Sequence, residues 1–218
     1  MLRPVRTVAD WAALLRSAAA ESGVFAGQAP SIEGFRDELG QHRPTDEPFL
    51  RWRAHRAGAA PRRLAVIPGA LDAALWASLL GDGADAESLL GGVAGAERSE
   101  MDRGSLLPRS MHRTIEVWTE TELAALHALS WLGRTSGRSH LSARCRDAVV
   151  WHVEHLQPDN ATNRPWSVHL FAEAGVAGDL DAQMYAETLL HNCRVGLGRP
   201  DRLSAHICLD AAEWLSGA

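Results

Sequence analysis

The residues best suited to chemistry lie between positions 151 and 171. His152 and His155 are three positions apart in a predicted helix, so their imidazoles project from one side of it. Trp166 and His169 repeat this spacing on the next predicted helix. Aromatic and imidazole groups are therefore expected to converge near the turn that joins the two helices.

That turn, QPDNATN, adds Asp159, Asn160 and Asn163. A carboxylate and two amides beside a helix N-terminus suit the binding of a polar ligand, with Trp151 and Trp166 as aromatic walls, and Asp159 also suits the holding of a catalytic histidine. The alternative is structural, because Pro-Asp-Asn is typical of turns and Asn163 suits a helix cap.

A later predicted helix places Glu187 and His191 four positions apart on one side. A metal ion held between helices takes nitrogen and oxygen ligands at such spacings, so one hypothesis is a divalent transition metal, zinc or iron. Glu187 would then be a ligand or the general base for a metal-bound water. Without a metal, a histidine oriented by Asp159 or Glu187 would transfer a proton. The structural alternative is a set of histidines hydrogen-bonded within the core. The predicted metal ligands are His152, His155, His169 and His191.

Motifs of established catalytic classes are absent from the chain. It contains no Walker A loop, no Rossmann glycine pattern, no G-x-S-x-G and no C-x-x-C. The sequence therefore leaves open whether the protein is an enzyme or a binding module.

The charge of the chain argues against general affinity for nucleic acid. The formal net charge is -5, and because the chain has no lysine, all 22 basic residues are arginine. Residues 51–63 carry five of these arginines. They suit either a solvated flank or contact with an acidic partner.

Three cysteines without recognisable spacing are expected to be buried free thiols in a reducing compartment. The first 20 residues are interrupted by charged side chains and lack the apolar core of a signal peptide. No run approaches the roughly 18 apolar residues of a membrane span. We therefore expect a cytoplasmic protein without membrane association.

The first half of the chain has weak patterning. Residues 7–21 place apolar side chains at helical spacing and predict an amphipathic helix. Residues 23–63 have too few apolar residues for a core of their own and are expected to wrap another surface. The other expected features are a short helix at 31–39, an extended run at 64–67, a helix at 70–80, a connection at 81–110 with a helical turn at 87–90, and one strand at 114–118.

The second half predicts regular helices. Thr119 and Glu122 have the spacing of a capping box, which predicts a helix start. Short Gly, Pro, Asn and Asp-rich separators predict antiparallel neighbours. The fold class is therefore mainly α, an array of antiparallel helical hairpins with an N-terminal helix and an irregular wrapping segment. We expect residues 1–110 and 111–218 to be two parts of one compact unit. The five predicted helices span 120–133, 140–156, 164–174, 180–195 and 201–216.

Two functions follow from these patterns. The first is a helical binding or assembly module that engages a protein partner or forms a homo-oligomer through the segment 23–63. The alternative is an enzyme with a histidine-rich pocket where the helices at 140–156, 164–174 and 180–195 meet.

Overall fold

The computed structural model describes residues 6–33, 35, 36, 38, 46–60, 70–82, 85–94, 104–111, 114–156, 158 and 162–217. Within these ranges the chain forms nine α-helices and one short 3₁₀ helix, and no residue lies in a strand. The predicted mainly α fold class is confirmed. The helices are α1 (Val8–Ala20), α2 (Asp46–Arg56), α3 (Leu71–Leu79), α4 (Ala86–Ala94), α5 (Ile115–Ser136), α6 (Ser139–His155), α7 (Val168–Val176), α8 (Leu180–Val195) and α9 (Arg202–Leu215), with the 3₁₀ helix η2 at Arg109–Met111.

Side-chain caps explain where several helices begin. The Thr7 hydroxyl accepts a hydrogen bond from the Asp10 backbone N–H, and the Asp10 carboxylate accepts from the Thr7 N–H in return. Asp179 caps α8 through the Ala182 N–H, which explains why α8 begins at residue 180; the helix ends at residue 195, as predicted. Such caps satisfy N–H groups that have no partner within the helix.

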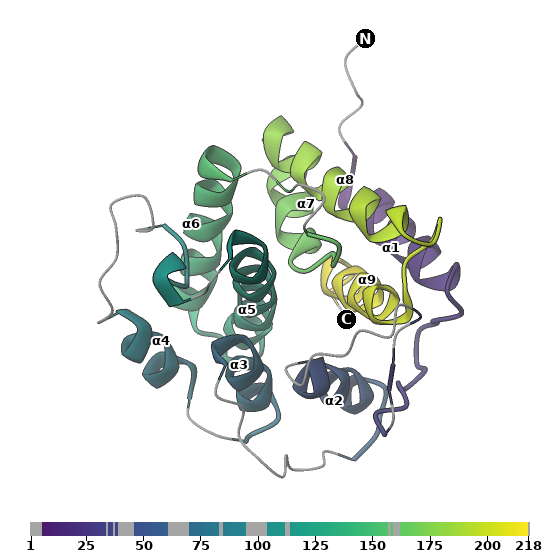
Figure 1. Cartoon of the computed structure of the whole chain (residues 1–218), viewed down its shortest axis with the longest axis horizontal. Helices are drawn as coiled ribbons and strands as arrows, with labels where there is room; N and C mark the ends of the chain where they lie inside the picture. The colour runs from purple at the N-terminus through teal and green to yellow at the C-terminus, as the bar shows by residue number, and fades with distance from the viewer. Residues whose placement is uncertain are drawn as a thin grey trace.

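Helices far apart in the sequence lie side by side (Figure 1). α5 and α9 lie near the middle of the view, and α1 from the N-terminal end packs along α9 from the C-terminal end. α7 packs on α8, α6 on α5, and α3 on the other side of α5. The N-terminal helix therefore covers a face of the C-terminal helix.

The predicted strand at 114–118 is wrong, because α5 begins there. Thr114 is the N-cap, and its hydroxyl accepts from the Val117 N–H. Thr119 is not a cap, since its hydroxyl donates to the Ile115 carbonyl one turn earlier in the same helix. Glu122 is fully buried, and its carboxylate accepts from the backbone N–H groups of Leu106 and Leu107, the latter at 2.7 Å. Thr119 and Glu122 therefore have the spacing of a capping box but do not form one.

The segment 23–63 is also more regular than its composition indicates. Its residues 46–56 form α2, which contacts α3 and α9 and buries Phe49 and Leu50 completely. The short helix predicted at 31–39 is absent from the described residues of that range. The extended run predicted at 64–67 lies outside the described residues.

The arginines of α2 form ion pairs with carboxylates of the same chain. Arg53 is 1% exposed, and its Nη1 lies 2.8 Å from Asp210 Oδ1 and 2.6 Å from Glu213 Oε2. Both carboxylates belong to α9. The interpretation of this stretch as a solvated flank is therefore wrong for Arg53, which joins α2 to α9.

Among the helices that the structure describes, none combines the length and the apolar character that a membrane span requires.

Candidate functional site

The four histidines predicted as metal ligands occupy different surroundings. His152 is buried, with Nδ1 3.3 Å from the Tyr185 hydroxyl and Nε2 3.7 Å from Glu122 Oε1. His155 is exposed and stacks on Trp151.

His169 is buried beside His127, whereas His191 is exposed on α8. Across the described ranges, no three His, Cys, Asp or Glu side chains gather as they would around a metal ion. These histidines therefore give the zinc or iron hypothesis no geometric support.

The remaining predicted residues that the structure describes do not form a common site either. Glu187 is half-buried and lies 3.4 Å from the Arg6 guanidinium Nε, and Asn163 is exposed. Trp166 is buried against Phe49, so it fills the core. Trp151 is buried too and packs edge-on against Trp118. Two further predicted residues, Asp159 and Asn160, lie outside the described residues.

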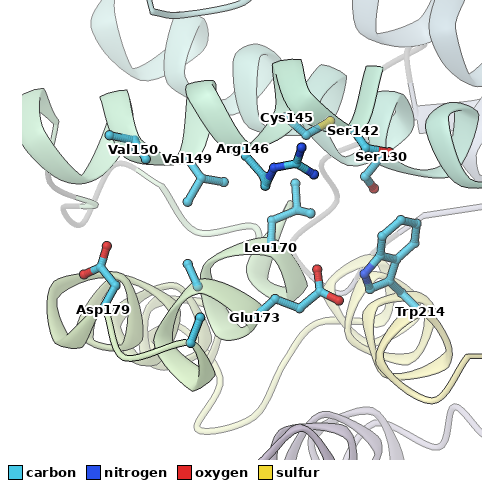
Figure 2. A pocket seen from close by; sticks show the side chains of 12 residues that line it. Ser130, Ser142, Cys145, Arg146, Val149, Val150, Leu170, Glu173, Asp179 and Trp214 are labelled. Atoms are coloured by element: carbon cyan, nitrogen blue, oxygen red, sulfur yellow. The ribbon is translucent and has the colours of Figure 1, made fainter. Parts of the chain in front are cut away.

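A cavity does lie where α6 and α7 meet, close to the junction at which a pocket was expected. Its volume is about 550 Å³, and α5, α9 and the start of α8 complete its walls (Figure 2). None of the predicted site residues that the structure describes lines it. The lining residues are Ser130, Ser142, Cys145, Arg146, Val149, Val150, Leu170, Glu173, Ala174, Ala177, Asp179 and Trp214.

Helical spacing explains why these residues share one cavity. The α6 wall uses positions 142, 145, 146, 149 and 150, and the α7 wall uses 170, 173, 174 and 177. Both sets follow the i, i+3, i+4 pattern of a single helix face. The pattern was visible in the sequence, but it is also typical of a helix face filled by its neighbours. Only the packing shows that these two faces leave space between them.

The walls are mostly apolar, with opposite charges on opposite sides. Val149 on α6 and Leu170 on α7 face the cavity, with Trp214 of α9 at one end (Figure 2). Arg146 projects from α6 into the space between the helices, and Glu173 rises from α7 on the other side. Such a cavity offers an apolar surface together with one cationic and one anionic group.

The pKa of the Glu173 carboxyl is raised. Burial by the cavity walls raises the pKa, and this outweighs the opposing effects of the Trp214 indole and the Arg134 guanidinium. A group opposite it that carries a positive charge would favour its ionised form.

A buried polar layer lies behind the cavity. The hydroxyl of Ser130, on α5, lies 2.9 Å from His169 Nε2 and donates to the His127 carbonyl at 2.7 Å. His127 accepts from the Ser167 N–H at Nδ1, and its Nε2 lies 3.2 Å from Asp210 Oδ2. Ser130 is therefore the point at which this layer reaches the cavity.

This layer does not have the geometry of a catalytic triad. The buried carboxylate, Asp210, lies beside His127 and not beside His169, whose Nδ1 has no hydrogen-bond partner among the described residues. Burial, then His127 and Arg134, hold the pKa of His169 well below its usual range. A histidine that is neither oriented by an acid nor basic is a poor activator of Ser130.

Cys145 is also a poor nucleophile. Burial raises the pKa of its thiol to about 12, despite the opposing effects of Arg144 and Arg146. Because the thiolate is the reactive form, this cysteine contributes to the cavity wall as a small apolar group.

Comparison with known proteins gave no match at the level of a family, a curated protein or a solved structure.

Proposed function

We propose that this protein binds a small organic molecule with a largely apolar body in the cavity between α6 and α7. The observation that carries this proposal is the cavity itself, about 550 Å³ in volume and walled mainly by apolar side chains. Ligand sites in proteins typically measure roughly 300 to 1,000 Å³ and combine an apolar lining with a few polar groups. Ser130, Arg146 and Glu173 are polar groups of this kind.

Binding is favoured over catalysis because the two side chains most suited to nucleophilic attack are not activated. Ser130 has no oriented base, and the Cys145 thiol stays protonated at neutral pH. Binding of a protein partner through the segment 23–63 is less supported, because α2 of that segment is packed against α3 and α9.

The proposal is tested by filling the cavity. N-phenyl-1-naphthylamine is a neutral fluorescent probe of apolar sites, and we expect one molecule to bind per chain with a rise in emission. Ala174 lines the cavity on α7, so Ala174→Trp would occupy its volume. We expect the affinity of this variant for the probe to fall at least about 10-fold, measured by fluorescence titration.

Ala13→Trp is the matched control, because Ala13 is an exposed residue within α1 and far in sequence from the cavity. It should bind the probe as the unmodified protein does. Circular dichroism would confirm that both variants remain folded. Equal affinity in the folded Ala174→Trp variant, or no binding to the unmodified protein, would overturn the proposal.

A further inference from the structure

We propose that the molecule bound in the α6–α7 cavity is a zwitterion, whose anionic group contacts Arg146 and whose cationic group contacts Glu173. This inference rests on the proposed function and names the class of ligand for the same cavity. It follows from the placement of the two charged side chains.

Arg146 supplies the site for the anionic group. It projects from α6 into the space above α7, and no hydrogen bond or ion pair joins its guanidinium to another described residue (Figure 2). A guanidinium presents paired N–H donors that match the two oxygens of a carboxylate. A carboxylate entering the cavity would therefore find a donor that is not already used.

Glu173 supplies the site for the cationic group. It stands on α7 across the cavity from Arg146, and Asp179 lines the same side (Figure 2). Asp179 is exposed to solvent at this end of the cavity, and Glu173 lies within its wall. Arg134 lies close enough to act on Glu173 but does not line the cavity, so the charged lining residues on this side are the two carboxylates.

The two charges do not neutralise each other. No ion pair within 4.0 Å joins Arg146 to Glu173, both of which lie in the described part of the chain, and Leu170 lies between them in Figure 2. A ligand with a single charge would satisfy one wall and face an unmatched charge on the other. A zwitterion satisfies both walls, while its apolar body covers Leu170 and Val149.

Four ligands that share a phenylalkyl body separate the contributions of charge. They are 2-amino-4-phenylbutanoate as the zwitterion, 4-phenylbutanoate as the anion, 4-phenylbutylamine as the cation and 4-phenylbutanol as the neutral compound. Each would be titrated against protein loaded with N-phenyl-1-naphthylamine, and displacement of the probe gives the affinity. We expect the zwitterion to bind at least about 10-fold more tightly than each of the others.

Two substitutions test which side chain contacts the anionic group of the ligand and which contacts the cationic group. Arg146→Gln should weaken the zwitterion and the anion about 10-fold and leave the neutral compound unchanged. Glu173→Gln should weaken the zwitterion and the cation by a similar factor. The matched controls are Arg194→Gln on α8 and Glu154→Gln on α6, both outside the cavity lining, and neither should change any of the four affinities.

The outcomes distinguish this inference from the proposed function. If the probe binds and Ala174→Trp abolishes its binding, but the four ligands bind equally, the cavity is a binding site and the zwitterion inference is wrong. The same conclusion follows if the anion or the cation alone matches the zwitterion. If the unmodified protein does not bind the probe, both proposals fail.

Discussion

Asp210 is a fully buried carboxylate of α9 that contacts polar side chains from two other helices. It accepts from Arg53 Nη1 of α2 at 2.8 Å and from the indole N–H of Trp131 of α5 at 2.5 Å, and it lies 3.2 Å from His127 Nε2. Burial alone would raise the pKa of Asp210, but Arg53 together with His127 and Trp131 lowers it below its usual value. The ionised carboxylate is thus stable in the core.

Arg53→Met is expected to lower the free energy of unfolding by about 3 to 5 kcal/mol, because it leaves Asp210 buried without its cation. Urea denaturation followed by circular dichroism measures this change. Arg194→Met removes a largely solvated ion pair with Glu21 and should cost less than about 1 kcal/mol. Similar losses in the two variants would show that the buried pair has no special role.

His206 is expected to make the stability of the protein depend on pH. Burial, then Arg53 and Arg202, lower the pKa of His206 to about 4, and Asp210 opposes this change. In the unfolded chain the pKa of histidine is about 6.5. Between these two values the unfolded chain binds a proton that the folded chain does not, so stability falls as the pH falls.

For a difference of about 2.5 pKa units, the expected loss between pH 6.5 and pH 4 is on the order of 3 kcal/mol. The low pKa of His169 acts in the same direction. Urea denaturation at several pH values from 7.5 to 4.5 would measure the loss. His206→Gln should have a shallower pH dependence than the unmodified protein, and parallel curves would contradict this origin.

At the scale of elements, the close approach of α7 to α8 depends on Gly175. A Cβ atom placed there would lie 2.8 Å from the Gln183 Cβ and 2.9 Å from its Cα. Gly175 was expected to belong to the separator after a helix ending at residue 174. It instead lies inside α7, where its missing side chain lets α7 and α8 pack closely.

Gly175→Ala should therefore destabilise the protein by about 1 to 3 kcal/mol, although alanine favours helix formation. Gly91→Ala is the matched control, since Gly91 lies in α4 and an added Cβ would meet no atom within 4 Å. The control should be neutral or more stable by up to about 1 kcal/mol. Thermal unfolding of both variants tests this, and a stabilised Gly175→Ala would contradict the packing argument.

At the scale of the molecule, one core connects both ends of the chain. Its buried side chains run from Trp11 in α1 to Leu215 in α9 and include Phe49 and Trp76 from the first half. The division into residues 1–110 and 111–218 stays a prediction. The shared core favours the further expectation that the whole chain behaves as one unit.

We consequently expect a single cooperative unfolding transition. Far-ultraviolet circular dichroism, which reports helix content, and tryptophan fluorescence, which reports core packing, should give coincident urea curves. Trp11→Ala should shift both curves together, because Trp11 is fully buried between α1 and the rest of the core. Two separated transitions, only one of them sensitive to this substitution, would favour two independent parts.

The amino-acid sequence by itself determined the mainly α fold class and, to within one residue, the bounds of α6, α8 and α9, whereas α5 begins earlier and α7 begins later than predicted. A helix start depends on a cap only a few residues away, so the bounds of α8 followed from Asp179 and its neighbours. The same local rules failed at Glu122, whose spacing from Thr119 imitated a cap while its carboxylate binds backbone N–H groups about 15 residues earlier.

Only the tertiary structure decided the candidate site. Arg146 and Glu173 lie on separate helices, and their opposition across a cavity depends on how α6 and α7 pack, which residue spacing within one helix does not encode. Arg53 and Asp210, 157 positions apart, show the same limit. Cavities and buried ion pairs arise from contacts between distant segments, whereas composition and periodicity report on near neighbours.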